Sequence, residues 1–431
     1  MTPLRPFLLR LTSGASALVL AHTVLSAGEP LRWPVDAFRP LTKDRVAALP
    51  TAKRSAWSAY WAESETRARA LGARSTTENA PAGPISGPPK GGAHTKGLRL
   101  DETAGWYGSP EAATTADRVV EWQTKAGAWT KGIDYTQARK VPAETESEVW
   151  SRGTFDNDAT TSELRFLARA IAASNELTRA DHWRQATLRG LDYIFAAQYP
   201  NGGFPQIYPL AGSYHDAVTF NYSTMTHALE LLRDVAAGAD GFAFIPAAQR
   251  QEADRRLRLG VECILSSQIK TAAGRRTVWG QQHDPLTLEP CAARNFEPIS
   301  ACASESAGVL RLLMSLPGPS PTIAASIGDA VAWLDHVALD DVAWDRGAET
   351  GSGLLPAPGA PKLWARLYEV DTDRPVFGDR DRTIHFVVTE LSSERRLGYG
   401  WYGTWPKDVL NEYREWQVRL PKPTNRPPAS R

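Results

Sequence analysis

Apolar residues recur at helical spacing through most of the chain between residues 103 and 405. Where they fall three and four residues apart, one face of a helix is apolar and can be buried. Few segments alternate strictly between apolar and polar residues, which is the pattern typical of strands. The spacing predicts helices over 165–171, 183–195, 224–235, 250–269, 307–314 and 323–337. We therefore expect an all-α dominated fold with minor β-strand content and long loops.

One pattern occurs twice in the predicted helical region. WQTKAGAWTK at 122–131 and AQYPNGGFPQ at 197–206 both show a helix end, a Gln, a Gly-containing turn, an aromatic residue and a polar residue. Gly suits a helix end because the chain turns there with positive φ. Two related helix ends indicate helical hairpins arranged around an axis. Their turns would then lie together at one rim, where a groove can form.

The ends of the chain differ from this central region in composition. Residues 1–27 contain Arg5 and Arg10, a short apolar run and small residues, which predicts a signal peptide and a secreted or periplasmic protein. An ordinary disordered N-terminus is the alternative, and the run is too short for a membrane span. Residues 28–95 form a helical segment, with Trp57, Tyr60 and Trp61 on one face, followed by a Pro/Gly-rich linker. Residues 96–410 form the main domain and 411–431 a C-terminal tail.

Charge and cysteine content narrow the function classes. Lys plus Arg number 49 against 48 Asp plus Glu, so the formal net charge is +1. We therefore expect no global attraction to nucleic acid or to an anionic membrane. An acidic ligand would need a local arginine cluster. The cysteines Cys263, Cys291 and Cys302 lack metal-site spacing, and either one disulfide with a free thiol or three buried thiols is expected.

A first candidate site precedes the helix predicted at 165–171. Asp156, Asn157 and Asp158 form a cluster in the loop before it. One interpretation is helix capping, with Asp158 or Thr160 as the cap and Glu163 completing a capping box. The other is a site for a hard cation, because carboxylate and amide oxygens suit calcium.

Three arginines in the second half of the chain are further candidates. Arg294 stands among small and aromatic residues and can pair with Glu289 or Glu297. It can serve as a base only where its surroundings lower its proton affinity, because its reference pKa is far above neutral. Arg366 and Arg380 have the forked geometry that binds carboxylates. The structural alternative for Arg366 is an ion pair with Glu369 along one helical turn.

Six segments occur in an order that resembles the family 10 pectate lyases over roughly residues 100–406. They are DNDATTSELRFLARA, AAQYPNGGFPQIYPL, VTFN, VWGQQHDPLTLEP, WARLYEVDTDRPVFGDRD and ERRLGYGWYGTWP. The resemblance implies an (α/α) toroid, an incomplete helical barrel. It also implies a secreted, monomeric enzyme that cleaves α-1,4-linked polygalacturonate by β-elimination, usually with calcium.

The resemblance assigns roles to individual residues of this chain. Arg294 matches the catalytic arginine that takes the proton from C5 of the galacturonate in the +1 subsite. Arg366 and Arg380 match arginines that bind substrate carboxylates. Asp156 matches an acidic residue of the active centre and is the metal-ligand candidate, with Asn157 beside it as a substrate contact. Such a set suits elimination, because cations stabilise the enolate-like charge that develops beside the carboxylate.

One segment departs from the family pattern. Where the family has Asn-Asp-Asp, this chain has Asn221, Tyr222 and Ser223. Tyr and Ser lack the carboxylate charge that binds calcium well. Calcium could be held by Asp156 and the substrate, or Asp216 could substitute for the missing acids. Alternatively, Asn221 and Tyr222 could bind the sugar carboxylate without metal.

These observations leave several functions open. The leading interpretation is a pectate lyase with Ca²⁺ as a cofactor. The alternatives are a calcium-independent lyase for a different polyuronate and a non-catalytic relative that binds acidic polysaccharide. A toroidal glycoside hydrolase would need two opposed carboxylates, such as Asp156 with Asp216 or Glu305.

Overall fold

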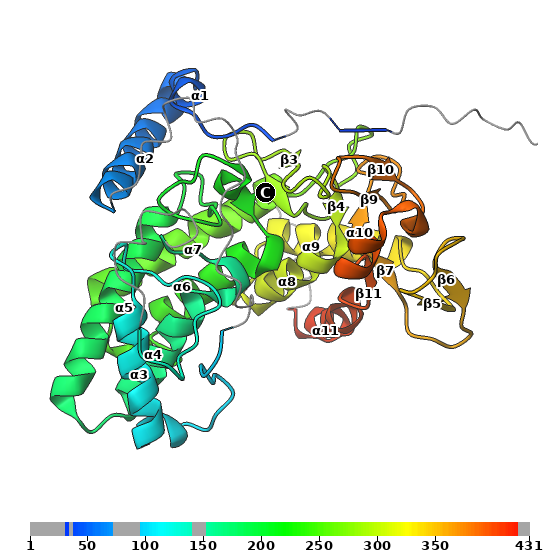
Figure 1. The fold of residues 1–431 in the computed structure, drawn as a ribbon. Coiled ribbons are helices and arrows are strands. Elements are labelled where there is room, and N and C mark those ends of the chain that lie inside the picture. The colour runs from blue at the N-terminus through cyan, green and yellow to red at the C-terminus, as the bar shows by residue number, and fades with distance from the viewer. Residues whose placement is uncertain (1–30, 34–37, 72–94, 140–151, 421–431) are drawn as a thin grey trace, which may run out of the picture.

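The computed structural model describes residues 31–33, 38–71, 95–139 and 152–420, and these residues are mainly helical (Figure 1). The helices are α1 (Lys43–Ala47), α2 (Thr51–Ala70), α3 (Pro110–Trp122), α4 (Thr161–Ala173), α5 (Leu177–Ala197), α6 (Thr224–Ala237), α7 (Ala247–Ser267), α8 (Ala303–Ser315), α9 (Pro321–His336), α10 (Ser393–Gly398) and α11 (Pro406–Arg419). The six segments with helical spacing all fall in α4 to α9 and extend at most two residues beyond the end of a helix. The prediction of a helix-dominated fold is confirmed.

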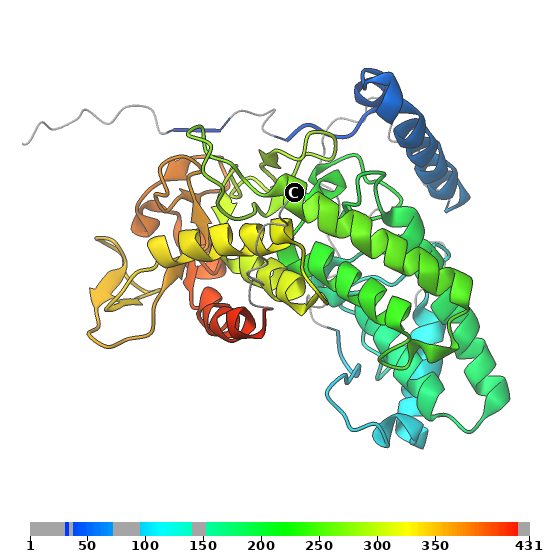
Figure 2. The same cartoon turned by 180° about the vertical axis from the view of Figure 1, so that it is seen from behind.

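The central helices are arranged as successive hairpins. Helix α4 packs on α5, α6 on α7, and α8 on α9, while α4, α6 and α8 also contact one another in that order. Seen from behind, α7 and α9 cover the face of the molecule nearest the viewer (Figure 2). The hairpins therefore form two layers, in which α4, α6 and α8 are the inner row and α5, α7 and α9 are the outer one.

The apolar stripes found in the sequence explain this packing. The inner helix α6 buries Met225, Ala228, Leu229 and Leu232 completely. Because these positions recur every three or four residues, they form one continuous face. The corresponding faces of the neighbouring helices belong to the same hydrophobic core.

The repeated helix ends are held by one recurring set of hydrogen bonds. Nε2 of Gln123 donates to the carbonyls of Gly127 and Ala186, both at 2.8 Å. Nε2 of Gln198 donates to those of Gly202 at 2.9 Å and Arg256 at 3.0 Å. Each Gln thus closes its own Gly turn and ties it to the following outer-layer helix. Gln268 repeats this role with Thr277 and Ser326, a third copy that the sequence pattern did not reveal.

The strands are two or three residues long and pair antiparallel. They are β1 (Val218–Thr219), β2 (Gln282–His283), β3 (Pro290–Cys291), β4 (Ala301–Cys302), β5 (Val342–Trp344), β6 (Leu354–Pro356), β7 (Trp364–Ala365), β8 (Leu367–Tyr368), β9 (Phe377–Gly378), β10 (Ile384–His385) and β11 (Tyr402–Gly403). Strands β1, β2 and β3 form one sheet, with Val218 opposite His283 and Gln282 opposite Cys291. Strand β8 pairs with β4, and β7 with β11. These short ladders fix the loops of the second half of the chain.

The N-terminal helices pack against the same core. Helix α2 buries Trp57 and Tyr60, which contact the ring of Tyr199 with centroids 5.2 and 4.9 Å away. The hydroxyl of Tyr60 donates to the carbonyl of Ala197 at 3.0 Å. At the C-terminal end of the chain, helix α11 packs on α8. It continues past residue 410, where the sequence analysis placed the boundary between the main domain and the tail. The predicted signal peptide, most of the Pro/Gly-rich linker predicted at the end of residues 28–95, and residues 421–431 lie outside the described residues.

The remaining expectations from the sequence concern thiols and membrane spans. Cys263, Cys291 and Cys302 are all buried and free, so the alternative of three buried thiols is the correct one. Within the described ranges, no helix has both the length and the apolar character needed to cross a membrane.

We expect Gly202→Ala to be strongly destabilising. Gly202 has a φ of 90°, and an added Cβ would collide with the backbone carbonyl of Leu259 in α7. The loss in free energy of unfolding should reach about 3 kcal/mol. Gly274→Ala is the matched control, because Gly274 has a similar φ of 81° but no atom within 4 Å of the added Cβ. It should cost only about 1 kcal/mol. Equal urea midpoints for the two variants would contradict this account.

Candidate active site

Two turns of the same shape lie side by side at the starts of α4 and α6. They are the 3-10 turns Asp156–Asp158 and Asn221–Ser223. Each follows a Thr-Phe pair, and each has positive φ at its second and third residues. Asp156 and Asn221 therefore occupy equivalent positions, and both are buried. The two matching turns therefore place Asp156, the predicted metal ligand, beside Asn221, a predicted substrate ligand.

Asp156 is paired with a cation from its own chain. Its Oδ2 forms an ion pair with Nζ of Lys131, and the two side chains are 9% and 28% exposed. The backbone N–H of Asp156 donates to Oγ1 of Thr154 at 3.0 Å, which fixes the turn. Oδ1 of Asp156 is buried, and no described residue donates a hydrogen bond to it.

Arg294 lies in the turn that follows β3 and is held by Glu297. Its Nε donates to Oε2 at 2.7 Å, its backbone N–H donates to the same oxygen at 3.2 Å, and its Nη2 donates to Oε1. Burial by itself lowers the pKa of the Arg294 guanidinium, but the hydrogen bonds and charge of Glu297 outweigh it and raise the pKa. Without a ligand, Arg294 is thus firmly protonated.

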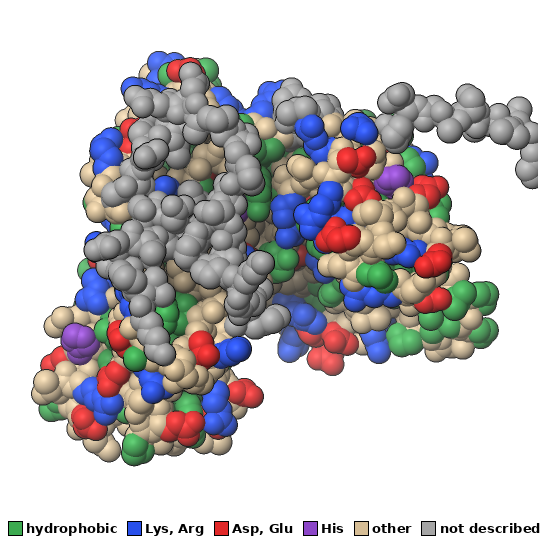
Figure 3. Space-filling model, viewed as in Figure 1, with side chains coloured by type: hydrophobic (Ala, Val, Ile, Leu, Met, Phe, Trp, Pro, Cys, Tyr) green, Lys and Arg blue, Asp and Glu red, His purple; other side chains and the backbone are tan. Residues whose placement is uncertain are grey.

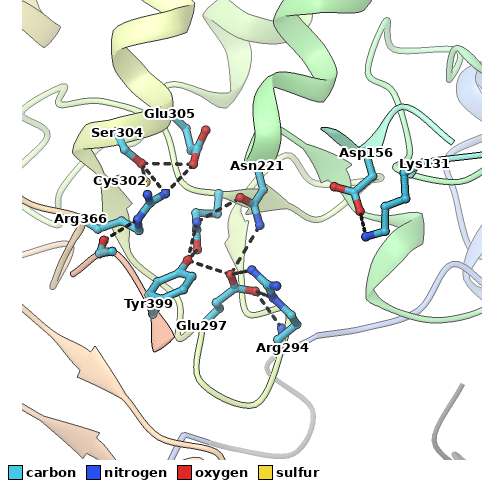
Figure 4. A network of polar contacts seen from close by, with 12 residues as sticks. Lys131, Asp156, Asn221, Arg294, Glu297, Cys302, Ser304, Glu305, Arg366 and Tyr399 are labelled. Carbon is cyan, nitrogen blue, oxygen red and sulfur yellow. Dashed lines mark hydrogen bonds and ion pairs between the residues drawn. The ribbon is translucent and has the colours of Figure 1, made fainter. Parts of the chain in front are cut away.

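Glu297 is 1% exposed and connects two further side chains, which a third, Gln281, joins to each other. Its Oε1 accepts from the Tyr399 hydroxyl at 2.9 Å and from Nδ2 of Asn221 at 3.4 Å. Nε2 of Gln281 donates to the Tyr399 oxygen at 3.1 Å and to Oδ1 of Asn221 at 3.3 Å. Figure 4 shows Asn221 between this network and the Lys131–Asp156 pair. Asn221 is thus fixed by its neighbours on one side of the site.

Arg366 lies between β7 and β8 and faces the start of α8. Its Nε donates to the carbonyl of Gly400 at 2.8 Å, and its Nη1 donates to Glu305 at 3.0 Å and Ser304 at 2.9 Å. Burial raises the pKa of the Glu305 carboxyl, and Arg366 opposes that effect. The predicted alternative, an ion pair of Arg366 with Glu369 along a helical turn, is wrong. The residues on both sides of Arg366 form the strands β7 and β8 and not a helix.

The three predicted arginines converge on two aromatic rings. The guanidinium of Arg294 lies 5.9 Å from the ring centroid of Tyr399, and that of Arg366 lies 5.1 Å from it. Arg294 and Arg380 lie 4.8 and 5.4 Å from the Phe296 centroid. Such contacts are favourable between a cation and the face of a ring. Residues that are up to 86 positions apart in sequence therefore form one basic cluster.

Arg380, on the turn after β9, is the most exposed member of this cluster. Its side chain is 60% exposed and forms an ion pair with Glu394, with Nε 2.9 Å from Oε2. The surface is hollowed between the two halves of the molecule, and Lys and Arg side chains gather along one border of the hollow (Figure 3). An anionic ligand would replace the exposed side chain of Glu394 as the partner of Arg380, with little change to the surrounding structure.

Tyr222 is 40% exposed and has a φ of 51°, which is uncommon for a bulky residue. The guanidinium of Arg294 lies 5.7 Å from its ring centroid. Tyr222 therefore contacts the basic cluster, and its neighbour Asn221 is joined to Arg294 through Glu297. Asn157 occupies the equivalent position of the other turn, with a φ of 50°.

The sequence analysis did not identify Tyr214 and His215 as site residues. Their rings stack with centroids 4.0 Å apart. Burial lowers the pKa of His215 to about 4, and Asp156, Lys131 and Arg294 all act on it electrostatically. This pair therefore lies near both the Lys131–Asp156 ion pair and the arginine cluster. Only the position of this pair, two residues before the VTFN segment, could have suggested it.

Two interpretations of acidic residues need correction. The Thr160 side chain makes no cap bond; its hydroxyl donates to the carbonyl of Thr154 at 2.9 Å, and Glu163 is buried with its Oε1 2.9 Å from the Tyr135 hydroxyl. The complete capping box is therefore absent. Asp216 is completely buried and accepts from the backbone N–H groups of Ala211 and Gly212. It is turned away from solvent to hold its own loop, so it replaces no metal ligand.

The comparisons with known proteins agree with this fold. The sequence profile of the pectic acid lyase family matches residues 123–410. The family 10 polysaccharide lyase from Cellvibrio cellulosa is 30% identical, with a TM-score of 0.63 over 75% of this chain and 99% of that one. An aspartate-to-alanine variant of that lyase, in complex with trigalacturonic acid, is also 30% identical, with a TM-score of 0.64 over 72% of this chain and 95% of that one. The comparison with curated proteins gave no match.

These findings place the protein among the polysaccharide lyases. The chain belongs to the pectic acid lyase family, whose profile covers most of the described helical region.

The residues present fit a calcium ion poorly. Calcium takes six to eight oxygen ligands, several of them usually carboxylates. The buried Oδ1 of Asp156 favours a cation, but its Oδ2 is paired with Lys131. The amide of Asn221 is engaged by Glu297 and Gln281. No group of three or more His, Cys, Asp or Glu side chains among the described residues is arranged to hold a metal.

Glu163 should make stability depend on pH. Burial raises the pKa of its carboxyl to about 7, while the unfolded chain ionises near pH 4.3. Between these values the folded state keeps a proton that the unfolded state has released. Stability therefore falls as pH rises from about 4.5 to about 7, by up to about 3 kcal/mol, and is level above that range.

We expect Glu163→Gln to remove part of this slope in urea titrations at pH 5 to 8. Asp216, whose pKa burial also raises to about 7, contributes a slope of the same sign. Asp216→Asn is therefore the matched variant, and the double variant should lose the contributions of both residues to the slope. A slope that is unchanged in Glu163→Gln would show that Glu163 is ionised in the folded protein.

Proposed function

We propose that this protein cleaves α-1,4-linked polygalacturonate by β-elimination and releases unsaturated oligogalacturonates. The observation that carries the proposal is the convergence of Arg294, Arg366 and Arg380 on the rings of Tyr399 and Phe296. Support comes from the pectic acid lyase profile and from the similar lyase, which binds trigalacturonic acid. We further propose that the enzyme is exported, as residues 1–27 predict.

In the proposed reaction, Arg294 takes the proton from C5 of a galacturonate unit. The C5 electron pair forms the C4–C5 double bond, the C4–O4 bond breaks, and the leaving oxygen takes a proton from water. Arg366 and Arg380 bind substrate carboxylates, where charge accumulates as the C5 proton leaves. Fixed guanidinium groups stabilise that charge without rearrangement at the moment of reaction.

The Glu297 contact sets a condition on this mechanism. It raises the pKa of Arg294, whereas a base must be available in its neutral form. The nearby cations Arg366 and Arg380 act in the opposite direction, because like charges disfavour protonation. We propose that substrate binding loosens the Arg294–Glu297 pair and that turnover increases toward alkaline pH.

Arg294→Ala should lower turnover of polygalacturonate at least about 1,000-fold, because it removes both the base and a cation of the cluster. Ultraviolet absorbance of the conjugated product is the measurement, with thermal unfolding as a check on folding. Arg275→Ala is the control, since Arg275 pairs with Asp373 at the surface. Retained turnover in Arg294→Ala would rule out this arginine as the base. Binding of the polymer by wild type without any absorbance rise would favour a non-catalytic role.

Glu297→Gln tests the base assignment separately. The neutral amide preserves the shape but weakens the charge-assisted hydrogen bonds, so the pKa of Arg294 should fall. The alkaline limb of the rate profile should then move down by about one to two pH units. Glu412→Gln, which affects only the surface pair with Arg311, should leave the profile in place. If Arg294 acts only as a fixed cation, Glu297→Gln will change the rate without moving the profile.

A further inference from the structure

Four acidic side chains around the site are each paired with a basic side chain of the same chain. The pairs are Asp156 with Lys131, Asp158 with His227, Glu297 with Arg294, and Glu305 with Arg366. A divalent ion at Asp156 would therefore compete with an existing ion pair. The question is whether Lys131 itself performs the ion's task.

Lys131 is held in place by the backbone on both sides of it. Trp129, two residues before, is completely buried; its indole N–H donates to the carbonyl of Val119 at 2.7 Å, and its backbone N–H donates to Oγ1 of Thr160 at 3.1 Å. Ile133, two residues after, is also buried. The ammonium group is thus delivered to Asp156 from a segment anchored in the core.

The neighbouring turn provides no carboxylate to complete a metal site. Asn221 occupies the position equivalent to Asp156, and Tyr222 and Ser223 occupy those equivalent to Asn157 and Asp158. Their side chains are all neutral. A fixed ammonium can neutralise the single carboxylate of Asp156, and its two other N–H groups can donate to an anionic ligand.

Lys131 and Arg294 of the arginine cluster both act electrostatically on the same imidazole, that of His215. His215 lies close enough to Lys131, Asp156 and Arg294 to be influenced by all three. Tyr214, which stacks on His215, is influenced by Asp156, Arg294 and Tyr222. A uronate unit beside this pair of rings would therefore lie in the field of two cations, Lys131 and Arg294.

We infer that Lys131 is the built-in cation of this subsite: its ammonium group takes the place beside Asp156 that a divalent ion would occupy and binds a carboxylate of the substrate. The nature of the ligand, a uronate, rests on the proposed function. The inference that no divalent ion binds beside Asp156 rests only on the ion pairs and the neutral side chains described above.

Metal binding is tested first, without reference to activity. Thermal unfolding and calorimetry of the purified protein, with calcium chloride and with chelator, should give the same midpoint and no binding heat for wild type. Lys131→Met should unfold at a lower temperature, because Asp156 is left buried and unpaired, and calcium should restore part of the loss. Lys407→Met, at an exposed position of α11, is the control and should respond to neither. A calcium-dependent rise for wild type would overturn the inference.

Turnover of polygalacturonate forms the second arm of the test. Wild type should be equally active in calcium and in chelator, and Lys131→Met should lose about 100-fold or more in chelator. Lys131→Arg keeps the charge, so it should fold normally and retain more activity than Lys131→Met. Full activity of Lys131→Met in chelator would overturn the inference. If wild type forms no unsaturated product, the proposed function fails, while the calcium measurements still decide whether Lys131 excludes the metal.

A gain of metal binding tests the charge argument directly. Tyr222→Asp combined with Ser223→Asp adds two carboxylates beside the Asp156 turn, at positions whose φ of 51° and 59° Asp tolerates well. With Lys131→Met added, the triple variant should bind calcium and unfold at a higher temperature in its presence. A triple variant indifferent to calcium would show that charge is not what excludes the metal, and the inference would fail.

Discussion

The buried carboxylate of Glu297 is the constraint on which the rest of the site depends. A carboxylate removed from water must be paired and hydrogen-bonded, or it destabilises the fold by several kcal/mol. Glu297 meets this requirement with Arg294 from its own turn, Asn221 from the start of α6 and Tyr399 from the segment after α10. One buried charge thus brings together three distant segments, and the ring of Tyr399 in turn supports Arg366.

Helix starts add to this electrostatic arrangement. Helices α4, α6 and α8 begin beside one another, at the Asp156 turn, the Asn221 turn and the Glu305 segment. A helix start carries partial positive charge, so three of them in one region favour an anionic ligand. The inner row of helices therefore does more than form the core. It orients backbone dipoles and guanidinium groups toward the same space.

Local patterns in the sequence predicted most of the fold and only part of the site. The six helical segments were evident because burial of one face requires apolar residues at a spacing of three to four. The pairing of Gln123 with Gly127 and of Gln198 with Gly202 was visible as a repeat, although its third copy at Gln268 was not. The resemblance to known lyases selected Arg294, Arg366 and Arg380, and the structure brings them together.

The missed features depend on contacts between distant segments. Tyr214 and His215 belong to no motif of their own, and their position becomes meaningful only when the two turns meet. Lys131 resembled an ordinary turn lysine until the fold placed it against Asp156, 25 positions later. Likewise, Glu163 matched a capping box by spacing, but burial and the Tyr135 hydroxyl determine its environment. Sequence spacing does not contain this long-range information.

The distribution of charge also separates elimination from hydrolysis. A glycoside hydrolase needs two carboxylates that face each other across the scissile bond, one of them free to act as a nucleophile or base. Here Glu305 is paired with Arg366, Asp156 with Lys131, and Asp216 holds its own loop from inside the core. The opposed carboxylates weighed for hydrolysis are therefore engaged elsewhere. What the fold presents to a ligand is a set of cations beside neutral amide, phenol and imidazole groups. This environment stabilises negative charge developing next to a carboxylate, which is what removal of the C5 proton produces.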